Sequence, residues 1–324
     1  MLITRRAAIV LAAASLVGSG SVAAQPYPGR PVRIVVPYPP GGPVDVLARI
    51  IAQELSGTLG QNFYVENKPG ASGALGTRDV ARSPADGYSL VLGTNQTHAT
   101  NASLLKEPGY DPVRDFVSVA GLADLQHVLT VRNDLGVTSL AELIALAKRE
   151  PGKLNYGSTG NGSASHLAME LFKSITGTQM QHVAFRGAAP LVQEIVAGRI
   201  DLSFVTLPSV LGQIQAGQAK ALAIASPMRA PQLPEVRLLR EQGVANGEAD
   251  AWVALFAPAA TPPDIIARLT GAVTAALAKP EVAANALKQG FVLNVRAPAQ
   301  FGPFVAAEVA KWAEVVKLAN VKAE

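Results

Sequence analysis

The sequence contains no cysteine and only four histidines, and both shortages exclude kinds of chemistry. Without cysteine, the chain forms no disulfide, has no thiol nucleophile and offers no sulfur ligand to a metal. The histidines, His98, His127, His166 and His182, are scattered, and none forms an H-x-x-x-H or H-x-H pair of the kind that binds zinc. We therefore expect neither a metal site nor a cofactor.

Long runs of one charge are also missing. The 28 Lys and Arg residues nearly balance the 24 Asp and Glu residues, and no basic run exceeds two residues. A nucleic-acid-binding protein would concentrate basic residues in a patch or stripe, so we expect no nucleic-acid partner. After the N-terminal segment, no stretch approaches the roughly 18 uninterrupted apolar residues of a membrane span, so we expect a soluble mature chain.

Residues 1–24 have the three-part plan of a secretory signal. Arg5 and Arg6 precede an apolar run from Ala7 to Val17, and small residues end at Ala24. This pattern predicts export and cleavage after Ala24. The arginine pair leaves both general secretion and the twin-arginine route open. A buried N-terminal helix of the mature fold is the alternative.

In the remaining 300 residues, short β-rich runs alternate with amphipathic helical patterns. Strands with two apolar faces, separated by helices, predict an α/β protein with mostly parallel sheets. The length and the number of strand–helix units suit two lobes. Glycines are expected to end helices at Gly177 and Gly198, and Thr261 is expected to cap another.

Several loops before expected helices are rich in glycine and hydroxyl side chains. Four of them lie in residues 37–49, 67–77, 93–101 and 154–172, and residues 185–190 are a candidate for a fifth. The first turn of a helix has unpaired N–H groups and a partial positive charge, and glycine allows a ligand to reach them. One such loop is common in α/β proteins. Together they favour a cleft that binds a small anion through backbone groups.

The sequence motifs of nucleotide-binding sites and of serine nucleophiles are incomplete in this chain. Gly157 and Gly162 have P-loop spacing, but no lysine follows, and neither a G-x-G-x-x-G nor a G-x-S-x-G motif is complete. Ser163 and His166 leave a hydrolase open as an alternative. Asp45, Glu194 and Asp201 could act as paired carboxylates, although Asp45 is better explained by the dipole of a helix start.

The ordered blocks of the sequence resemble a known family. They include "YPGRPVRIVVPYPPGGPVDVLAR", "VENKPGASGALGT", "ADGYSLVLGTN", "KLNYGSTGNGSASHLAMELF", "HVAFRGAAPLVQEIVAGRIDLSF" and "WVALFAPAATPPDII". From about Tyr27 to the C-terminus, the chain resembles the Bug-type periplasmic solute receptors of tripartite tricarboxylate transporters. "VAF" followed by Arg186 stands where the family more often has Pro, Tyr and Lys, which leaves the ligand open.

The resemblance implies a two-lobe periplasmic binding protein of type II-like fold, with each lobe a mostly parallel sheet flanked by helices. It implies that the receptor is a monomer, catalyses no reaction and docks transiently on membrane transporter subunits. The ligand would be a small carboxylate: a di- or tricarboxylate, an acidic amino acid or an aromatic acid. A ligand sensor that acts with a membrane histidine kinase remains an alternative. The implied lobes are residues 25–125 with 256–324, and 126–255.

The resemblance also implies a ligand held between loops 38–45, 70–73 and 158–163. Arg186, the one cation inside a glycine loop, is either a lid contact to the ligand or a solvated side chain. The expected ligand-binding residues are Tyr38, Gly41, Gly42, Asp45, Ala71, Ser72, Gly73, Thr94, Asn95, Ser158, Thr159, Gly160, Gly162, Ser163, His166, Arg186, Gly187 and Asp201.

Overall fold

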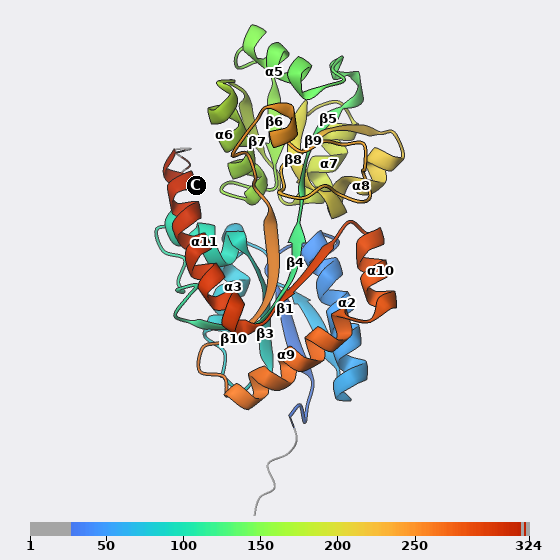
Figure 1. Cartoon of the computed structure of the whole chain (residues 1–324). Coiled ribbons are helices and arrows are strands. Elements are labelled where there is room, and N and C mark those ends of the chain that lie inside the picture. Colours follow the sequence, from blue (N-terminus) through green and yellow to red (C-terminus); the bar gives the residue numbers. More distant parts are fainter. Residues whose placement is uncertain (1–26, 319–320, 322–324) are drawn as a thin grey trace, which may run out of the picture.

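The computed structural model describes residues 27–318 and 321, so the predicted signal at residues 1–24 lies outside the described residues. The strands form two separate sheets (Figure 1). We call the parts built on them the first and second lobe. In spatial order, the first-lobe sheet contains β11 (Val292–Arg296), β4 (Phe116–Leu125), β10 (Ala251–Pro258), β3 (Ser89–Thr94), β1 (Val32–Val36) and β2 (Phe63–Asn67). The second-lobe sheet contains β7 (Gln181–Ala184), β6 (Asn155–Ser158), β8 (Leu202–Thr206), β5 (His127–Arg132) and β9 (Ala219–Ile224).

Both sheets are mixed, rather than mostly parallel as expected. Strands β2, β1 and β3 are parallel, as are β7, β6 and β8, whereas β10 pairs antiparallel with β3 and β4, and β5 with β8 and β9. The cause is the crossing of the chain between lobes. Strand β4 runs out of the first sheet and continues after Gln126 as β5, and β10 returns beside it in the opposite direction. The predicted segment boundary at 255/256 falls inside β10.

Helices cover the sheets of both lobes (Figure 1). The described first lobe contains α2 (Pro43–Leu59), α3 (Ala74–Ala81), α4 (Asn101–Leu104), α9 (Pro263–Leu277), α10 (Pro280–Lys288), α11 (Pro298–Leu318), a 3-10 turn at Ala71–Gly73 and a π-helical turn at Gln96–Thr100. The described second lobe contains α5 (Leu140–Arg149), α6 (Ala164–Thr176), α7 (Ala188–Val196), α8 (Leu207–Gln215) and 3-10 turns at Asn133–Leu135 and Arg240–Gln242. None of these helices is long and apolar enough to cross a membrane.

Local signals set several helix ends. Pro43 begins α2, and Gly177 and Gly198 take left-handed backbone just after α6 and α7, with φ of 64° and 75°. The predicted cap at Thr261 is wrong. The residue before α9 is Pro262, and the Thr261 hydroxyl donates to the carbonyl of Pro258 at 2.7 Å. That bond closes the turn after β10, so the hydroxyl serves the turn rather than the helix.

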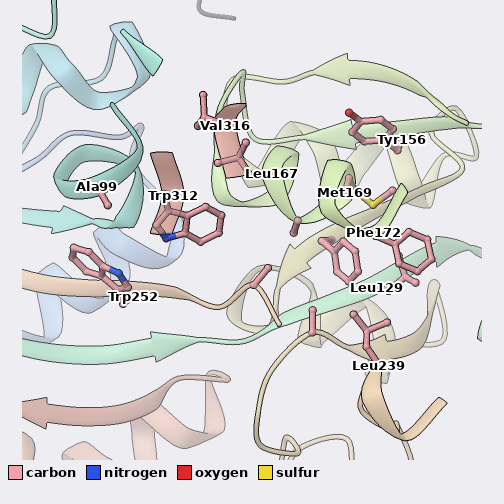
Figure 2. Packing of buried hydrophobic residues seen from close by; sticks show 14 of the residues in the cluster. Ala99, Leu129, Tyr156, Leu167, Met169, Phe172, Leu239, Trp252, Trp312 and Val316 are labelled. Carbon is pink, nitrogen blue, oxygen red and sulfur yellow. The ribbon is translucent and has the colours of Figure 1, made fainter. Parts of the chain in front are cut away.

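Helix α11 packs on β4 of the first-lobe sheet and also contacts α6 of the second lobe. The indole nitrogens of Trp252 and Trp312 both donate to Glu308 Oε2, at 2.9 and 2.8 Å. One hydrophobic cluster contains both tryptophans together with Val316 and, from α6, Leu167 (Figure 2). Apolar packing therefore continues from one lobe into the other along α11.

Candidate functional site

A cavity of about 260 Å³ lies between the two lobes. Its first-lobe wall consists of Tyr38, Pro39, Pro40, Gly42, Pro43, Val44, Thr94, Asn95, Gln96, Leu125 and Ala251. Its second-lobe wall consists of His127, Thr159, Ser163, Ala164, Ser165, Arg186, Gly187, Ala188, Ala189, Pro190 and Thr206. Thus loops that are distant in the sequence meet around one space.

The start of a helix lies at the cavity wall in four places. Helix α2 begins there at Pro43, α6 follows Ser163, α7 follows Gly187, and α8 follows Thr206. Unpaired N–H groups and the helix dipole make each of these ends attractive to an anion. Arg186 is the only charged side chain among the described lining residues, and none of them is acidic. The cavity is therefore electrostatically suited to a small anion.

Eight of the eighteen expected site residues line this cavity. They are Tyr38, Gly42, Thr94, Asn95, Thr159, Ser163, Arg186 and Gly187. The other ten do not line it. They are Gly41, Asp45, Ala71, Ser72, Gly73, Ser158, Gly160, Gly162, His166 and Asp201. Asp201 precedes β8, at the opposite end of that strand from Thr206, which lines the cavity.

Both expected carboxylates are bound to other parts of the protein. Asp45 is 3% exposed and accepts from the Gly41 N–H, the Arg49 guanidinium and the Asn67 amide at 2.9–3.0 Å. Burial opposes its ionisation, but these hydrogen bonds hold the pKa of Asp45 below its usual value. Its carboxylate thus shapes the loop before α2.

Asp201 has a similar role in the second lobe. Its carboxylate pairs with Arg132 Nε at 2.8 Å and accepts from the N–H of Asn155 at 2.7 Å. These bonds connect the start of β8 to β5 and β6. Asp201 therefore aligns strands of the second-lobe sheet.

The loop at residues 70–73 crosses toward the other lobe. Gly70, Ala71, Ser72 and Gly73 all have positive φ, of 131°, 47°, 54° and 82°. Left-handed backbone is costly for alanine and serine, so the surroundings must hold it. The Asn101 amide donates to the Ser72 carbonyl at 3.0 Å, and the Ser72 hydroxyl lies 3.5 Å from the carbonyl of Asn161 in the second lobe.

Ser163 and His166 do not form a nucleophile–base pair. His166 Nδ1 accepts from the N–H of Gly162 at 3.0 Å, and the Ser163 hydroxyl caps α6 by accepting from the N–H of His166 at 3.3 Å. The His166 ring stacks on His182 at 3.8 Å. Burial, with the nearby His182, lowers the pKa of His166 to about 4, so the ring is neutral at pH 7. A hydrolytic pair needs the hydroxyl on a ring nitrogen, and the structure gives both groups other partners.

Ser158 and Gly160 form the underside of the same loop. The Ser158 hydroxyl lies 2.6 Å from His182 Nε2, and it contacts the carbonyl of Gly160 at 3.1 Å. Ser158 is fully buried beneath Thr159, which faces the cavity. These residues therefore hold the loop in shape while its neighbours line the space.

Fourteen lining residues were not expected from the sequence. They are Pro39, Pro40, Pro43, Val44, Gln96, Leu125, His127, Ala164, Ser165, Ala188, Ala189, Pro190, Thr206 and Ala251. Most lie beside predicted residues in the same loops, so the loops themselves were the available signal. Leu125, His127 and Ala251 lie where the chain crosses between the lobes. No local pattern marks them.

His127 is the most enclosed of these missed residues. Its Nδ1 lies 2.7 Å from the carbonyl of Ala249, which precedes the returning strand β10. Burial lowers the pKa of His127 to about 4, so its ring is also neutral at pH 7. His127 joins the two chain crossings beside the cavity.

Two lobes connected by crossing strands, with an anion-suited cavity between them, define a solute-binding protein. The chain belongs to the tripartite tricarboxylate transporter family of receptors, whose model matches residues 47–321. It is 36% identical over 302 residues to the protein BugT of Bordetella pertussis, and the match covers 93% of each chain.

Solved structures of related proteins have the same architecture. The R. palustris protein Rpa4515 with adipate is 36% identical, with a TM-score of 0.88, and the match covers 91% of this chain and 99% of that one. The periplasmic binding protein BugD is 33% identical, with a TM-score of 0.85 and coverage of 91% and 99%. MatC from Rhodopseudomonas palustris with malate is 33% identical, with a TM-score of 0.84 and coverage of 90% and 100%.

Proposed function

We propose that this receptor captures a small carboxylate in the cavity between its lobes and delivers it to a membrane transporter of the tripartite tricarboxylate type. The observation that carries the proposal is the convergence of four helix starts and Arg186 on a cavity without an acidic lining residue. Two related proteins hold adipate and malate, which are both carboxylates.

The ligand carboxylate is proposed to contact the backbone near Gly42, Thr159, Ser163 and Gly187. Gly42 comes from the first lobe and the other three from the second, so a ligand held by them would draw the lobes together. The chain crossings at Gln126 and Asp250 would then act as the hinge. Arg186 would meet the ligand from the edge of the second lobe, where its side chain is exposed.

We further propose that the protein works as an exported monomer, docks transiently on transporter subunits and catalyses no reaction. Its family and the N-terminal signal support a periplasmic place of action. The hydrogen bonds of Ser163 and His166 offer no catalytic pair.

The test is thermal unfolding of the exported chain, residues 25–324, with millimolar adipate, succinate, phenylacetate or citrate. A binding carboxylate raises the melting temperature in a concentration-dependent way. Analysis of the incubated acid by mass spectrometry should show it unchanged. The proposal fails if no carboxylate shifts the melting temperature, and the receptor role fails if the acid is converted.

A further inference from the structure

We propose that the cavity selects carboxylates with a plain hydrocarbon body, aliphatic or aromatic, and discriminates against carboxylates that carry hydroxyl or ammonium groups. This inference rests on the proposed carboxylate-binding function and narrows its ligand class. Three observations support it. The cavity wall is largely apolar, several hydroxyl groups of the wall are hydrogen-bonded to one another, and none of the described lining residues is acidic.

The wall is apolar on both sides. Pro39, Pro40 and Val44 line it from the first lobe, Leu125 lies at the crossing, and Pro190 faces it from the second lobe. Val44 and Leu125 are 7% and 2% exposed, so the small area that each presents to the cavity is apolar. Hydrocarbon placed against such groups leaves water, and each buried methylene strengthens binding about fourfold.

The hydroxyl groups of the wall are largely engaged with one another. The hydroxyls of Tyr38 and Thr94 lie 2.6 Å apart, and those of Ser163 and Ser165 lie 2.9 Å apart. The Thr159 hydroxyl lies 3.1 Å from the same Ser165 oxygen, which also accepts the Thr159 N–H at 2.9 Å. A hydroxyl on the ligand body would compete with these existing hydrogen bonds, and losing one net hydrogen bond weakens binding about tenfold.

An ammonium group would find no counter-charge. None of the described lining residues is acidic, and the carboxylates of Asp45 and Asp201 are tied to Arg49 and Arg132. The helix starts add positive potential, which repels a cation. The same potential favours the carboxylate.

Asn95 and Arg186 can donate to the carboxylate or to another acceptor on the ligand. Asn95 is 1% exposed and lines the cavity, and its amide nitrogen has no hydrogen-bond partner among the residues that the structure describes. Arg186 makes no ion pair within the described part of the chain. Both groups are donors, so they suit the carboxylate of an anionic ligand.

Calorimetry of the exported chain with matched acids tests the inference. Succinate, malate and aspartate differ only by a hydrogen, hydroxyl or ammonium group, and phenylacetate and mandelate form a second pair. We expect each plain acid to bind about tenfold or more tightly than its substituted partners. Equal or tighter binding of malate, aspartate or mandelate overturns this inference and leaves the receptor function standing. If no acid binds, the receptor proposal falls as well.

A variant of Val44 tests whether the apolar cavity wall causes this preference. Val44→Thr replaces a cavity-lining methyl group by a hydroxyl of nearly the same volume, and should reduce the succinate-to-malate affinity ratio several-fold. Val196→Thr makes the same change at the far end of α7, on a side chain that is 39% exposed, and should leave the ratio unchanged. An unchanged ratio in Val44→Thr would show that the wall does not set the preference.

Discussion

Gly162 in the second lobe packs directly against Leu104 in the first lobe. Gly162 has a φ of 66°, and a Cβ built on it would collide with the side chain of Leu104. From the sequence, Gly162 was expected to touch the ligand. The structure shows a further constraint at Gly162: the two lobes meet there, and a residue without a side chain allows the loop to approach Leu104.

We therefore expect Gly162→Ala to weaken carboxylate binding strongly, by holding the lobes apart, while the fold survives. Gly177→Ala is the matched control. It has a similar φ of 64° with no atom within 4 Å, so it adds the backbone strain of about 1 kcal/mol without a collision. Calorimetry with adipate should show a large loss only for Gly162→Ala. Adding Leu104→Ala should recover part of it; equal binding in both glycine variants would contradict this reading.

Ser163→Ala should be mild. The hydroxyl caps α6, so its loss should cost about 1 kcal/mol of folding stability, and about 1 kcal/mol of binding if it also donates to the ligand. Ser139 caps α5 in the same way and does not line the cavity. Ser139→Ala should lower stability similarly and leave adipate binding intact. Complete loss of function in Ser163→Ala alone would instead support a nucleophile.

Arg186→Gln should weaken binding of every carboxylate, because it removes the only charged side chain of the described lining. The expected loss is about tenfold at low ionic strength, and it should shrink as salt screens the charge. Arg149→Gln removes an exposed charge on α5, away from the cavity, and serves as the control. If both variants bind adipate equally, Arg186 is only a solvated side chain.

Stability should depend on Asp250, beside the returning crossing. Its Oδ2 accepts from the Ser226 hydroxyl at 2.7 Å. Burial chiefly, with the nearby Asp124, raises the pKa of Asp250 to about 7. The native state therefore binds this proton more tightly than the unfolded chain does.

Because this folded-state pKa is raised, ionisation of Asp250 makes folding less favourable as pH rises from about 4 to about 7, and the full penalty persists above 7. Asp250→Asn removes the penalty. Its melting temperature should exceed that of the unmodified protein by a few degrees at pH 8, with a smaller difference at pH 5. A difference that does not change with pH would show that this carboxyl titrates normally.

Export should remove residues 1–24. The two arginines, the apolar run and the small residues before Gln25 predict cleavage there. Mass spectrometry of the exported protein should find an N-terminus at Gln25 or within two residues of it. A mature chain that begins at Met1 would refute the signal.

The sequence by itself determined the local features. Pro43 begins α2, Ser163 caps α6 and Gly177 ends it, because capping and left-handed backbone depend on residues within one turn. The glycine-rich loops were also visible, and several of their residues surround the cavity. Helix caps and turns depend on residues that are close together in the chain, so the sequence alone can predict them.

The tertiary structure alone decided strand direction and which loop residues face the cavity. A buried antiparallel strand such as β10 has the same apolar pattern as a buried parallel one, so the mixed sheets follow only from the path of the chain between lobes. Asp45 turns toward Arg49, whereas Val44 beside it faces the cavity. Leu125 and Ala251 line the cavity because two crossings of the chain meet there, and contacts between such distant residues leave no pattern in either segment.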